Sequence, residues 1–329
     1  MSGASIPYHL RANKAIDRYA FLELLSKIDR YSSISNYKYI GFGGSSLEDF
    51  KYIHSRFGLE NMLSIEEDAD VYNRQKFNQP HNCIDCLQQS SSQFIDEFQR
   101  TQETIIWLDY VKPKELRKQI EEFQATISKL ERLDIIKITV NSHAASYVPS
   151  DASMKSSDIL QNARISKLKI VLGDIFPAAE VTVNMMTEKR FPEALHLVLK
   201  YAANLAMEGK NDIYFQPLTA FAYADGQQML TVTGIMLEQN KKQDFLDKTN
   251  IDKWKLSNID WTPPRRINVP DLTIKERLHI DSRLPNFEAK TIQDELGFLF
   301  DSKESVSLEM LKTYVLFYRH SPYFSRIVF

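Results

Sequence analysis

Apolar residues recur at three- and four-residue steps over residues 14–30, a segment without proline or glycine. This spacing predicts an amphipathic helix. Short apolar runs and helical stretches then alternate along the chain. The runs are YKYIGF, NMLSIE, NCIDCL, TIIWLDYV and IIKITV, and the helices between them are expected at 47–57, 72–78, 94–99 and 114–132. Such an alternation favours an α/β fold with a parallel sheet covered on both faces, because parallel neighbours need crossover connections.

The alternation stops after Asn141. Residues 142–187 form an irregular insertion, and a long helical stretch follows it. Residues 213–237 then predict two strands joined at Asp225-Gly226, a dipeptide suited to a tight hairpin turn. We therefore expect an antiparallel hairpin at the end of the parallel sheet.

This pattern divides the chain into three parts. They are an N-terminal helix within residues 1–36, a Rossmann-like sheet domain at 37–240 that carries the insertion, and a linker with a small, mostly helical module at 241–329. The prolines of TPPRRINVPDLT indicate the linker, because they cannot continue a helix. We expect the aromatic end of the chain, YVLFYRHSPYFSRIVF, to pack on the sheet domain. The alternative is a surface for a homo- or hetero-oligomer.

Composition and charge point to no particular partner. The chain is 43% hydrophobic and 26% charged, with a formal net charge of -2. It therefore has no global attraction to polyanions, although nucleic acid stays open as a partner. The beginning of the chain lacks the apolar core of a signal peptide, and no later run reaches the length that spans a bilayer. We expect a cytoplasmic protein without a membrane partner.

Cys83 and Cys86 form a CxxC pair, a spacing found in redox sites and in zinc sites, but the chain has no second pair. If NCIDCL is a strand, the odd separation sends the two thiols to opposite faces. They then lie roughly 10 Å apart, which is too far for a disulfide. We expect two ordinary buried thiols and no metal site.

Glycines end the first expected strand, and an acid ends the second. The glycines of YIGFGGSS are Gly41, Gly43 and Gly44. They let the backbone approach a ligand, and the next helix offers free N–H groups, so a side chain at Gly43 should block that approach. Glu66 in LSIEED is placed to accept both ribose hydroxyls of an adenosyl group. The simpler alternatives are a tight turn for the glycines and helix-start acids for Glu67 and Asp68.

The fourth and fifth expected strands also end in polar residues. Asp109 and Tyr110 follow IIWL at the edge where ligands of open α/β sheets collect. Both are catalytic candidates, and Asp109 is the best one. His143, just beyond the fifth strand, could act as a general base because imidazole titrates near neutral pH. The alternatives are a solvated acid or helix cap at Asp109 and a plain surface histidine. The segment QQSSSQ after the third strand could contact adenine.

In this order the motifs resemble the class I S-adenosylmethionine-dependent methyltransferases and, more narrowly, bacterial "putative O-methyltransferases" with an RxNK-type first helix. An antiparallel last strand is typical of that class. The resemblance covers about residues 8–240 and is carried by LRANK, GFGG, LEDF, SIEED and WLDY. It implies that the glycines and Glu66 bind S-adenosylmethionine and that Asp109 lies near the methyl sulfonium. Lys14 and Arg11 would bind the methionine carboxylate or an anionic substrate, unless they are a solvated helix start.

Differences between this sequence and the motifs of other methyltransferases reduce the number of possible reactions. The letters DYVK at 109–112 differ from the D/N-P-P-Y/F of enzymes that methylate base amino groups, and no cysteine beyond Cys86 can serve C5-cytosine chemistry. Val140 stands where metal-dependent O-methyltransferases need a second acid, so Mg2+ is poorly supported. We expect methyl transfer to an oxygen or nitrogen acceptor. The alternatives are a non-catalytic cofactor-binding or assembly subunit of a larger, for example defence-related, system and a nicotinamide-dependent oxidoreductase.

Overall fold

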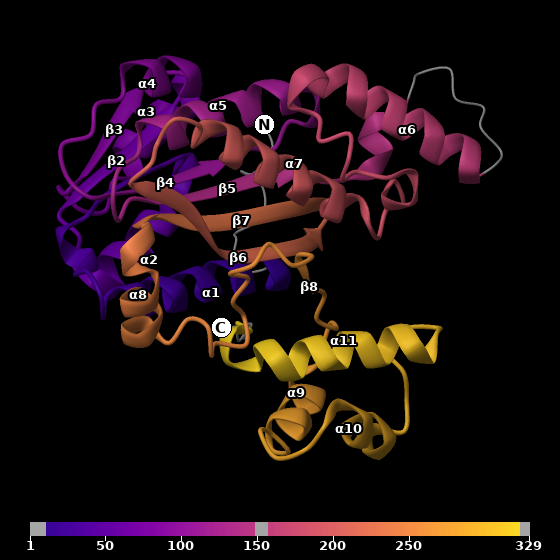
Figure 1. The fold of residues 1–329 in the computed structure, drawn as a ribbon. Coiled ribbons are helices and arrows are strands. Elements are labelled where there is room, and N and C mark those ends of the chain that lie inside the picture. Colours follow the sequence, from indigo (N-terminus) through magenta and orange to yellow (C-terminus); the bar gives the residue numbers. More distant parts are fainter. Residues whose placement is uncertain (1–10, 149–156, 323–329) are drawn as a thin grey trace. The chain divides into compact units, whose positions relative to one another are not determined.

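The computed structural model describes residues 11–148 and 157–322 (Figure 1). The first residues of the chain, residues 149–156 of the insertion and the last seven residues of the aromatic tail lie outside this part. The described residues divide into two compact units. The first contains Leu22–Ala222 and Gln227–Arg265, and the second contains residues 11–21, Tyr223–Gly226 and residues 266–322. The division into three parts that we expect from the sequence stays a prediction.

The helices are α1 (Ala12–Ile28), α2 (Glu48–Phe57), α3 (Ala69–Asn78), α4 (Ser91–Glu97), α5 (Leu116–Lys129), α6 (Ser157–Leu172), α7 (Phe191–Ala206), α8 (Lys242–Thr249), α9 (Ile274–Asp281), α10 (Ala289–Leu296) and α11 (Glu304–Phe317). The strands are β1 (Lys38–Gly41), β2 (Asn61–Glu66), β3 (Ile84–Gln88), β4 (Thr104–Asp109), β5 (Ile135–Asn141), β6 (Ile213–Asp225), β7 (Gln227–Glu238) and β8 (Arg265–Ile267). All the strands predicted from the sequence are present within one or two residues of their expected bounds. Two elements in the expected linker, α8 and β8, were not predicted.

The strands form one sheet in the order β3-β2-β1-β4-β5-β7-β6-β8. The pairs β1·β2, β2·β3, β1·β4 and β4·β5 are parallel, whereas β5 and β7 pair antiparallel, with Ile135 opposite Ile235. This arrangement confirms the predicted α/β fold. A parallel sheet with an antiparallel β7 beside β5 is the Rossmann-like sheet of class I methyltransferases.

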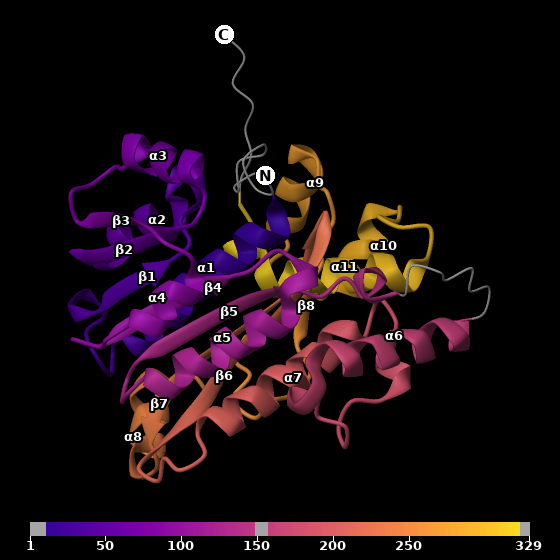
Figure 2. The ribbon, with the colours of Figure 1, turned by 90° about the horizontal axis from the view of Figure 1, so that it is seen from above.

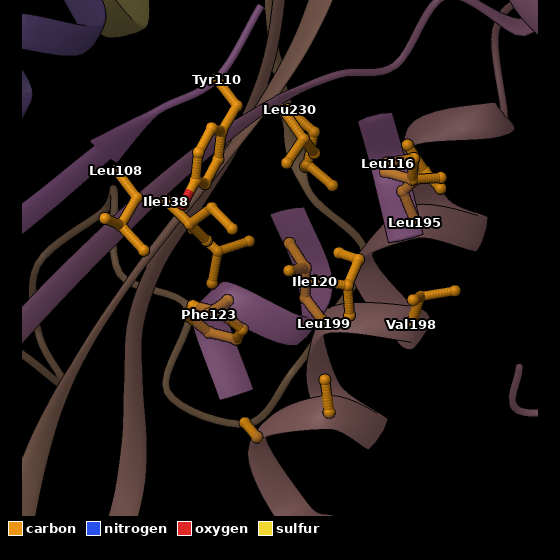
Figure 3. Close-up of a cluster of buried hydrophobic side chains, with 14 of the residues drawn as sticks. Leu108, Tyr110, Leu116, Ile120, Phe123, Ile138, Leu195, Val198, Leu199 and Leu230 are labelled. Carbon is orange, nitrogen blue, oxygen red and sulfur yellow. The ribbon is translucent and has the colours of Figure 1, made fainter. Parts of the chain in front are cut away.

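Helices cover both faces of this sheet, and β5 is buried along its whole length. On one face α5 and α7 lie side by side (Figures 1 and 2). Their apolar residues, among them Phe123 and Leu199, pack with Leu108 and Ile138 of the sheet (Figure 3). Side chains alternate between the two faces of a strand, and on the other face the ring of Tyr39 lies 4.8 Å from that of Phe50 in α2.

The second unit joins the hairpin turn to the beginning of α1. Nδ2 of Asn13 donates to the carbonyl of Ala224 at 3.2 Å and to the carboxylate of Asp225 at 2.9 Å. The N–H of Lys14 donates to the same carboxylate at 2.7 Å. The N–H of Val269 donates to Oδ1 of Asn13 at 3.0 Å. Asp225 thus satisfies a backbone N–H in the first turn of α1 from a position 211 residues away in sequence.

The C-terminal helices of the second unit carry part of the aromatic end of the chain. Tyr314 and Phe317 of α11 are buried, and the Tyr314 hydroxyl donates to the carboxylate of Asp281 at 2.7 Å. Nε of Arg277 lies 3.5 Å from that carboxylate. These aromatic residues are therefore core residues. None of the helices in the described ranges is long and apolar enough to cross a membrane.

His196 is a buried titratable group within α7. Its side chain is 1% exposed, and its ring lies 5.1 Å from the ring of Trp261. Burial, with a smaller effect of the Lys200 charge, lowers its pKa to about 4. Its Nε2 has no hydrogen-bond partner in the described ranges. The folded state therefore contains neutral imidazole, and protonation favours unfolding.

We predict that His196→Leu makes the protein less sensitive to acid. The folded pKa of about 4 lies below the unfolded value of about 6.5, so the stabilisation is complete above about pH 6.5 and is lost as the pH falls toward 4. The full difference is about 3 kcal/mol. Urea unfolding from about pH 7.5 to about pH 4.5 should show a smaller loss of unfolding free energy in His196→Leu than in wild type. The exposed His81→Leu is the control, and parallel curves for wild type and His196→Leu would contradict the prediction.

Candidate functional site

The carboxyl ends of the parallel strands meet at one edge of the sheet in the first unit. The ladders set Gly41 of β1 beside Trp107 of β4 and Glu66 of β2 beside Gln88 of β3. The chain runs from β1 outward to β2 and β3, then returns to the other side of β1 at β4. The boundary between β1 and β4 is therefore the topological switch point, where open α/β sheets bind ligands.

The glycine loop after β1 is held by β2 and α3. The N–H of Gly43 donates to Oγ of Ser64 at 3.1 Å, and that hydroxyl donates to Oε1 of Gln75 at 3.2 Å. Ser64 and Gln75 are fully buried. Nδ2 of Asn78 donates to the carbonyl of Ser45 at 2.7 Å. The protein thus fixes this loop without help from a ligand, and the N–H of Gly43 is used within the protein.

Gly43 has a packing role that we did not predict. A Cβ atom at this position would lie 2.4 Å from Cδ2 of Leu47, 2.6 Å from Oγ of Ser64 and 3.0 Å from Cε2 of Phe50. All three atoms belong to side chains of the first unit. A larger residue at position 43 would therefore displace the loop itself, whereas the sequence led us to expect only a block to the ligand.

The other two glycines also have local reasons in the packing or the backbone. A Cβ atom at Gly41 would lie 3.0 Å from the hydroxyl of Tyr39 and 3.4 Å from the carbonyl of Trp107. Gly44 has a φ of 54°, in the left-handed region that favours glycine. The glycines let the loop pack closely against the sheet, and their assignment to a cofactor stays a prediction.

Glu66 is half-buried at the end of β2. One of its carboxylate oxygens accepts the N–H of Asp68 at 2.9 Å. Burial raises the pKa of Glu66, and this backbone hydrogen bond opposes the shift. Asp68 caps α3, because its Oδ1 accepts the N–H groups of Asp70 and Val71 at 2.9 and 3.0 Å. Asp68 is thus the helix-start acid, and Glu66 remains the candidate for a ligand.

The polar residues after β3 make bonds within the first unit. Ser90 caps α4 in a reciprocal pair with Gln93. Nε2 of Gln89 donates to Glu97 at 2.9 Å. The expected adenine contact from this segment stays a prediction.

Asp109 and Tyr110, at the end of β4, have different surroundings. Asp109 is the last residue of the strand and is half-buried. The ring of Tyr110 points into the apolar cluster near Leu108 (Figure 3), and its hydroxyl donates to the carboxylate of Glu122 in α5. Burial, and then the Glu122 charge, raises the pKa of Tyr110 well above its usual value. Tyr110 is therefore a protonated core residue whose hydroxyl is used within the protein, and its place among the catalytic candidates stays a prediction.

A charged cluster lies just beyond β5. Nδ1 of His143 lies 3.3 Å from Oε2 of Glu188, and this oxygen also accepts the N–H of Ala144 at 3.1 Å. The other oxygen of Glu188 accepts from the Arg164 guanidinium at 2.8 Å. The side chains of His143 and Glu188 are 44% and 48% exposed, whereas that of Arg164 is 8% exposed. A buried cation therefore fixes an acid that contacts an accessible imidazole.

The backbone around His143 is fixed as well. Its N–H donates to Oδ1 of Asn141 at 3.0 Å. Nε2 of Gln228 in β7 donates to the carbonyls of Ser142 and Glu188 at 2.8 and 2.9 Å. These bonds join the end of β5, the beginning of β7 and the end of the insertion into one rigid corner.

The remaining predicted ligands are Lys14 and Arg11. Both belong to the second unit, and their contact with a cofactor or substrate stays a prediction.

Cys83 and Cys86 are free thiols that are half-buried, not fully buried as expected. Burial raises the pKa of both. Within the described ranges, no three His, Cys, Asp or Glu side chains gather in a way that could hold a metal ion.

The sequence matches the model of a protein family described as "Putative O-methyltransferase" over residues 6–329. The chain belongs to this family. No curated protein matches its sequence. The family match extends past the motifs noted above and includes the C-terminal helices, so both units are part of what this O-methyltransferase family shares.

Several solved methyltransferase structures are similar to this family member. They include the N-methyltransferase NodS from Bradyrhizobium japonicum WM9, with 9% identity over 68% of this chain and 97% of that chain and a TM-score of 0.38. A putative O-methyltransferase from Klebsiella pneumoniae has 10% identity over 70% and 90% and a TM-score of 0.38. The plantazolicin methyltransferase BamL, solved in complex with SAH, has 13% identity over 69% and 87% and a TM-score of 0.37. We base the fold assignment on the strand order.

Residues that hold the site together were missing from the sequence-based prediction. They are Ser64, Gln75, Glu122, Arg164 and Glu188. Each acts through a partner distant in sequence; the bond from Ala144 to Glu188, for example, spans 44 residues. No local motif indicates such partners. Near Glu188, the sequence shows only the charged run EKR before α7, which does not identify its partners.

We predict that Ser64→Ala destabilises the first unit by about 1–3 kcal/mol, because the N–H of Gly43 and the amide of Gln75 lose a buried partner. Gly43→Ala should lower the unfolding free energy by about 1–3 kcal/mol, because the added methyl group overpacks against Leu47. Urea unfolding at neutral pH measures both effects, with the exposed Ser35→Ala as the matched control. Unfolding free energies within about 0.5 kcal/mol of wild type for both variants would show that the loop is not held in this way.

Proposed function

We propose that the first unit binds S-adenosylmethionine across the carboxyl ends of β1, β2 and β4 and transfers its methyl group to an oxygen or nitrogen acceptor. One observation carries this proposal: a closely packed glycine loop and a half-buried acid follow adjacent parallel strands at the switch point of the sheet. Membership of an O-methyltransferase family supports it.

The residues at this edge suit the proposed cofactor. Gly41 and Gly43 remove side chains where the backbone must come close to other atoms. Glu66 accepts the N–H of Asp68, and a carboxylate has about four acceptor positions, so it can also accept a ribose hydroxyl. Adjacent strands lie about 4.8 Å apart, so the glycine loop and Glu66 are within reach of one adenosyl group.

The chain's own part in the reaction is to align the acceptor. S-adenosylmethionine supplies an electrophilic methyl group, and displacement at that carbon depends mainly on proximity and orientation. Asp109 ends β4, the strand next to β1 on the side away from β2 and Glu66. We place Asp109 beside the acceptor, where it orients the attacking group or accepts its proton. The antiparallel β7 disfavours the alternative of a nicotinamide-dependent oxidoreductase.

We predict that Glu66→Ala weakens S-adenosylmethionine binding by about 10-fold to 100-fold, the effect of losing hydrogen bonds to a charged group. Isothermal titration calorimetry with S-adenosylmethionine measures this change. The neighbouring exposed acid provides the control, because Glu67→Ala should bind as wild type does. If Glu66→Ala keeps the wild-type dissociation constant, Glu66 is not a ribose ligand.

We predict that Asp109→Asn lowers methyl transfer by about 100-fold or more, in the range of general acid–base groups, while cofactor affinity changes little. Transfer is measured with methyl-labelled S-adenosylmethionine and a cell extract, and Asp85→Asn on the edge strand β3 is the control. If the variant loses cofactor binding instead, Asp109 is a cofactor ligand. If wild type binds the cofactor but labels nothing, the chain is a non-catalytic binding subunit.

A further inference from the structure

We propose that His143 is the general base of the transfer to a hydroxyl acceptor and that Glu188 is its positioning residue. This inference rests on the proposed function and on the O-methyltransferase description of the family, and it names two further residues of the same site. It is carried by the cluster beyond β5, in which His143, Glu188 and Arg164 are joined.

The contact with Glu188 favours one position for the imidazole proton. Nδ1 of His143 lies 3.3 Å from a carboxylate oxygen, which can only accept, so the contact favours the tautomer with the hydrogen on Nδ1 and the lone pair on Nε2. Ala144 donates to the same oxygen of Glu188, and Arg164 donates to the other. Both oxygens are thereby held in place, so the acid presents a fixed acceptor to Nδ1 of the imidazole.

The cluster lies at the same edge of the sheet as the glycine loop. His143 follows Asn141, the last residue of β5, and β4 separates β5 from β1. With about 4.8 Å between strands, the ends of β1 and β5 are about 10 Å apart across the sheet. The proposed base lies at the end of β5, and the proposed cofactor lies on the side of β1. The acceptor would then lie between them, at the end of β4 beside Asp109. The imidazole is accessible from solvent, since its side chain is 44% exposed.

A base of this kind is needed by a hydroxyl acceptor. A neutral amine already has a nucleophilic lone pair and can release its proton after transfer, whereas a hydroxyl becomes a good nucleophile as it loses its proton. The acceptor oxygen forms a bond to the methyl carbon while the carbon–sulfur bond breaks. The electron pair of that bond passes to sulfur, which becomes a neutral thioether. The hydroxyl proton moves to Nε2 of His143, and Glu188 stabilises the resulting positive charge.

The burial of Arg164 separates this arrangement from an ordinary surface ion pair. An exposed ion pair contributes only about 0–1 kcal/mol to stability and restricts its two side chains weakly. Here the guanidinium is 8% exposed and also donates to the carbonyl of Met186 at 2.8 Å. The partly exposed acid is therefore fixed by a cation from inside the protein.

The first test needs no acceptor. The tautomer of His143 is read from long-range proton–nitrogen NMR spectra of protein labelled with 15N-histidine and bound to S-adenosylhomocysteine, and His143→Ala identifies the signal. We expect the neutral ring to be protonated at Nδ1 in wild type and in Glu180→Gln, and to become a mixture of both tautomers in Glu188→Ala. Glu180 is the matched control, because it is another partly exposed glutamate in an ion pair, with Lys200. A wild-type ring protonated at Nε2, or a tautomer unchanged in Glu188→Ala, would overturn the proposal.

The second test uses transfer of a labelled methyl group from S-adenosylmethionine to the small-molecule fraction of a cell extract, with the product linkage determined by mass spectrometry. We expect an O-methyl product and a fall of about 100-fold or more in His143→Ala, with partial recovery when free imidazole is added. Glu188→Gln should lower the rate of methyl transfer about 10-fold, and Glu180→Gln should transfer at the wild-type rate.

The outcomes of the second test distinguish two failures. An N-methyl product, or transfer that is unaffected in His143→Ala, overturns the base assignment alone. A fall in His143→Ala that imidazole does not relieve assigns the residue a structural role and also overturns it. Absence of S-adenosylmethionine binding in wild type, measured by calorimetry, overturns the proposed function itself.

Discussion

In the first unit, β1 forms parallel backbone ladders on both sides, with β2 and with β4. All three strands therefore end at the same edge, and the loops that follow them must share that edge. The glycine loop follows β1, Glu66 ends β2 and Asp109 ends β4. Every part of the proposed cofactor site depends on this pairing, because a strand run in the opposite direction would carry its terminal residue to the other end of the sheet.

Buried polar residues then fix what the pairing brings together. Ser64 and Gln75 hold the glycine loop from within β2 and α3. Arg164 holds Glu188, which contacts His143. In both places a residue without access to solvent determines the geometry of one that can meet a ligand. A site built on such contacts keeps its geometry before the ligand arrives, and less conformational entropy is lost on binding.

The sequence predicted the fold well because the fold is encoded by local patterns. Alternating apolar runs located the strands, and Asp225-Gly226 located the hairpin that makes β7 antiparallel. The candidate residues at strand ends could be named for the same reason. Their roles could not, because a role depends on tertiary contacts: Tyr110 turned out to face Glu122 in the core, and Gly43 turned out to be limited by Leu47 and Phe50. Likewise α8 was missed, since it buries only Phe245, Leu246 and Thr249 within a polar segment.

The central claim is that an adenosyl cofactor binds at the carboxyl edge of β1 and β2. Hydrogen–deuterium exchange with and without saturating S-adenosylhomocysteine tests it most directly, since backbone protection reports where a ligand binds without any knowledge of the acceptor. The account predicts slower exchange in peptides that cover residues 41–47 and 61–68, and unchanged exchange at residues 131–135, at the opposite edge. Unchanged exchange in the first two segments, or protection confined to the opposite edge, would contradict it.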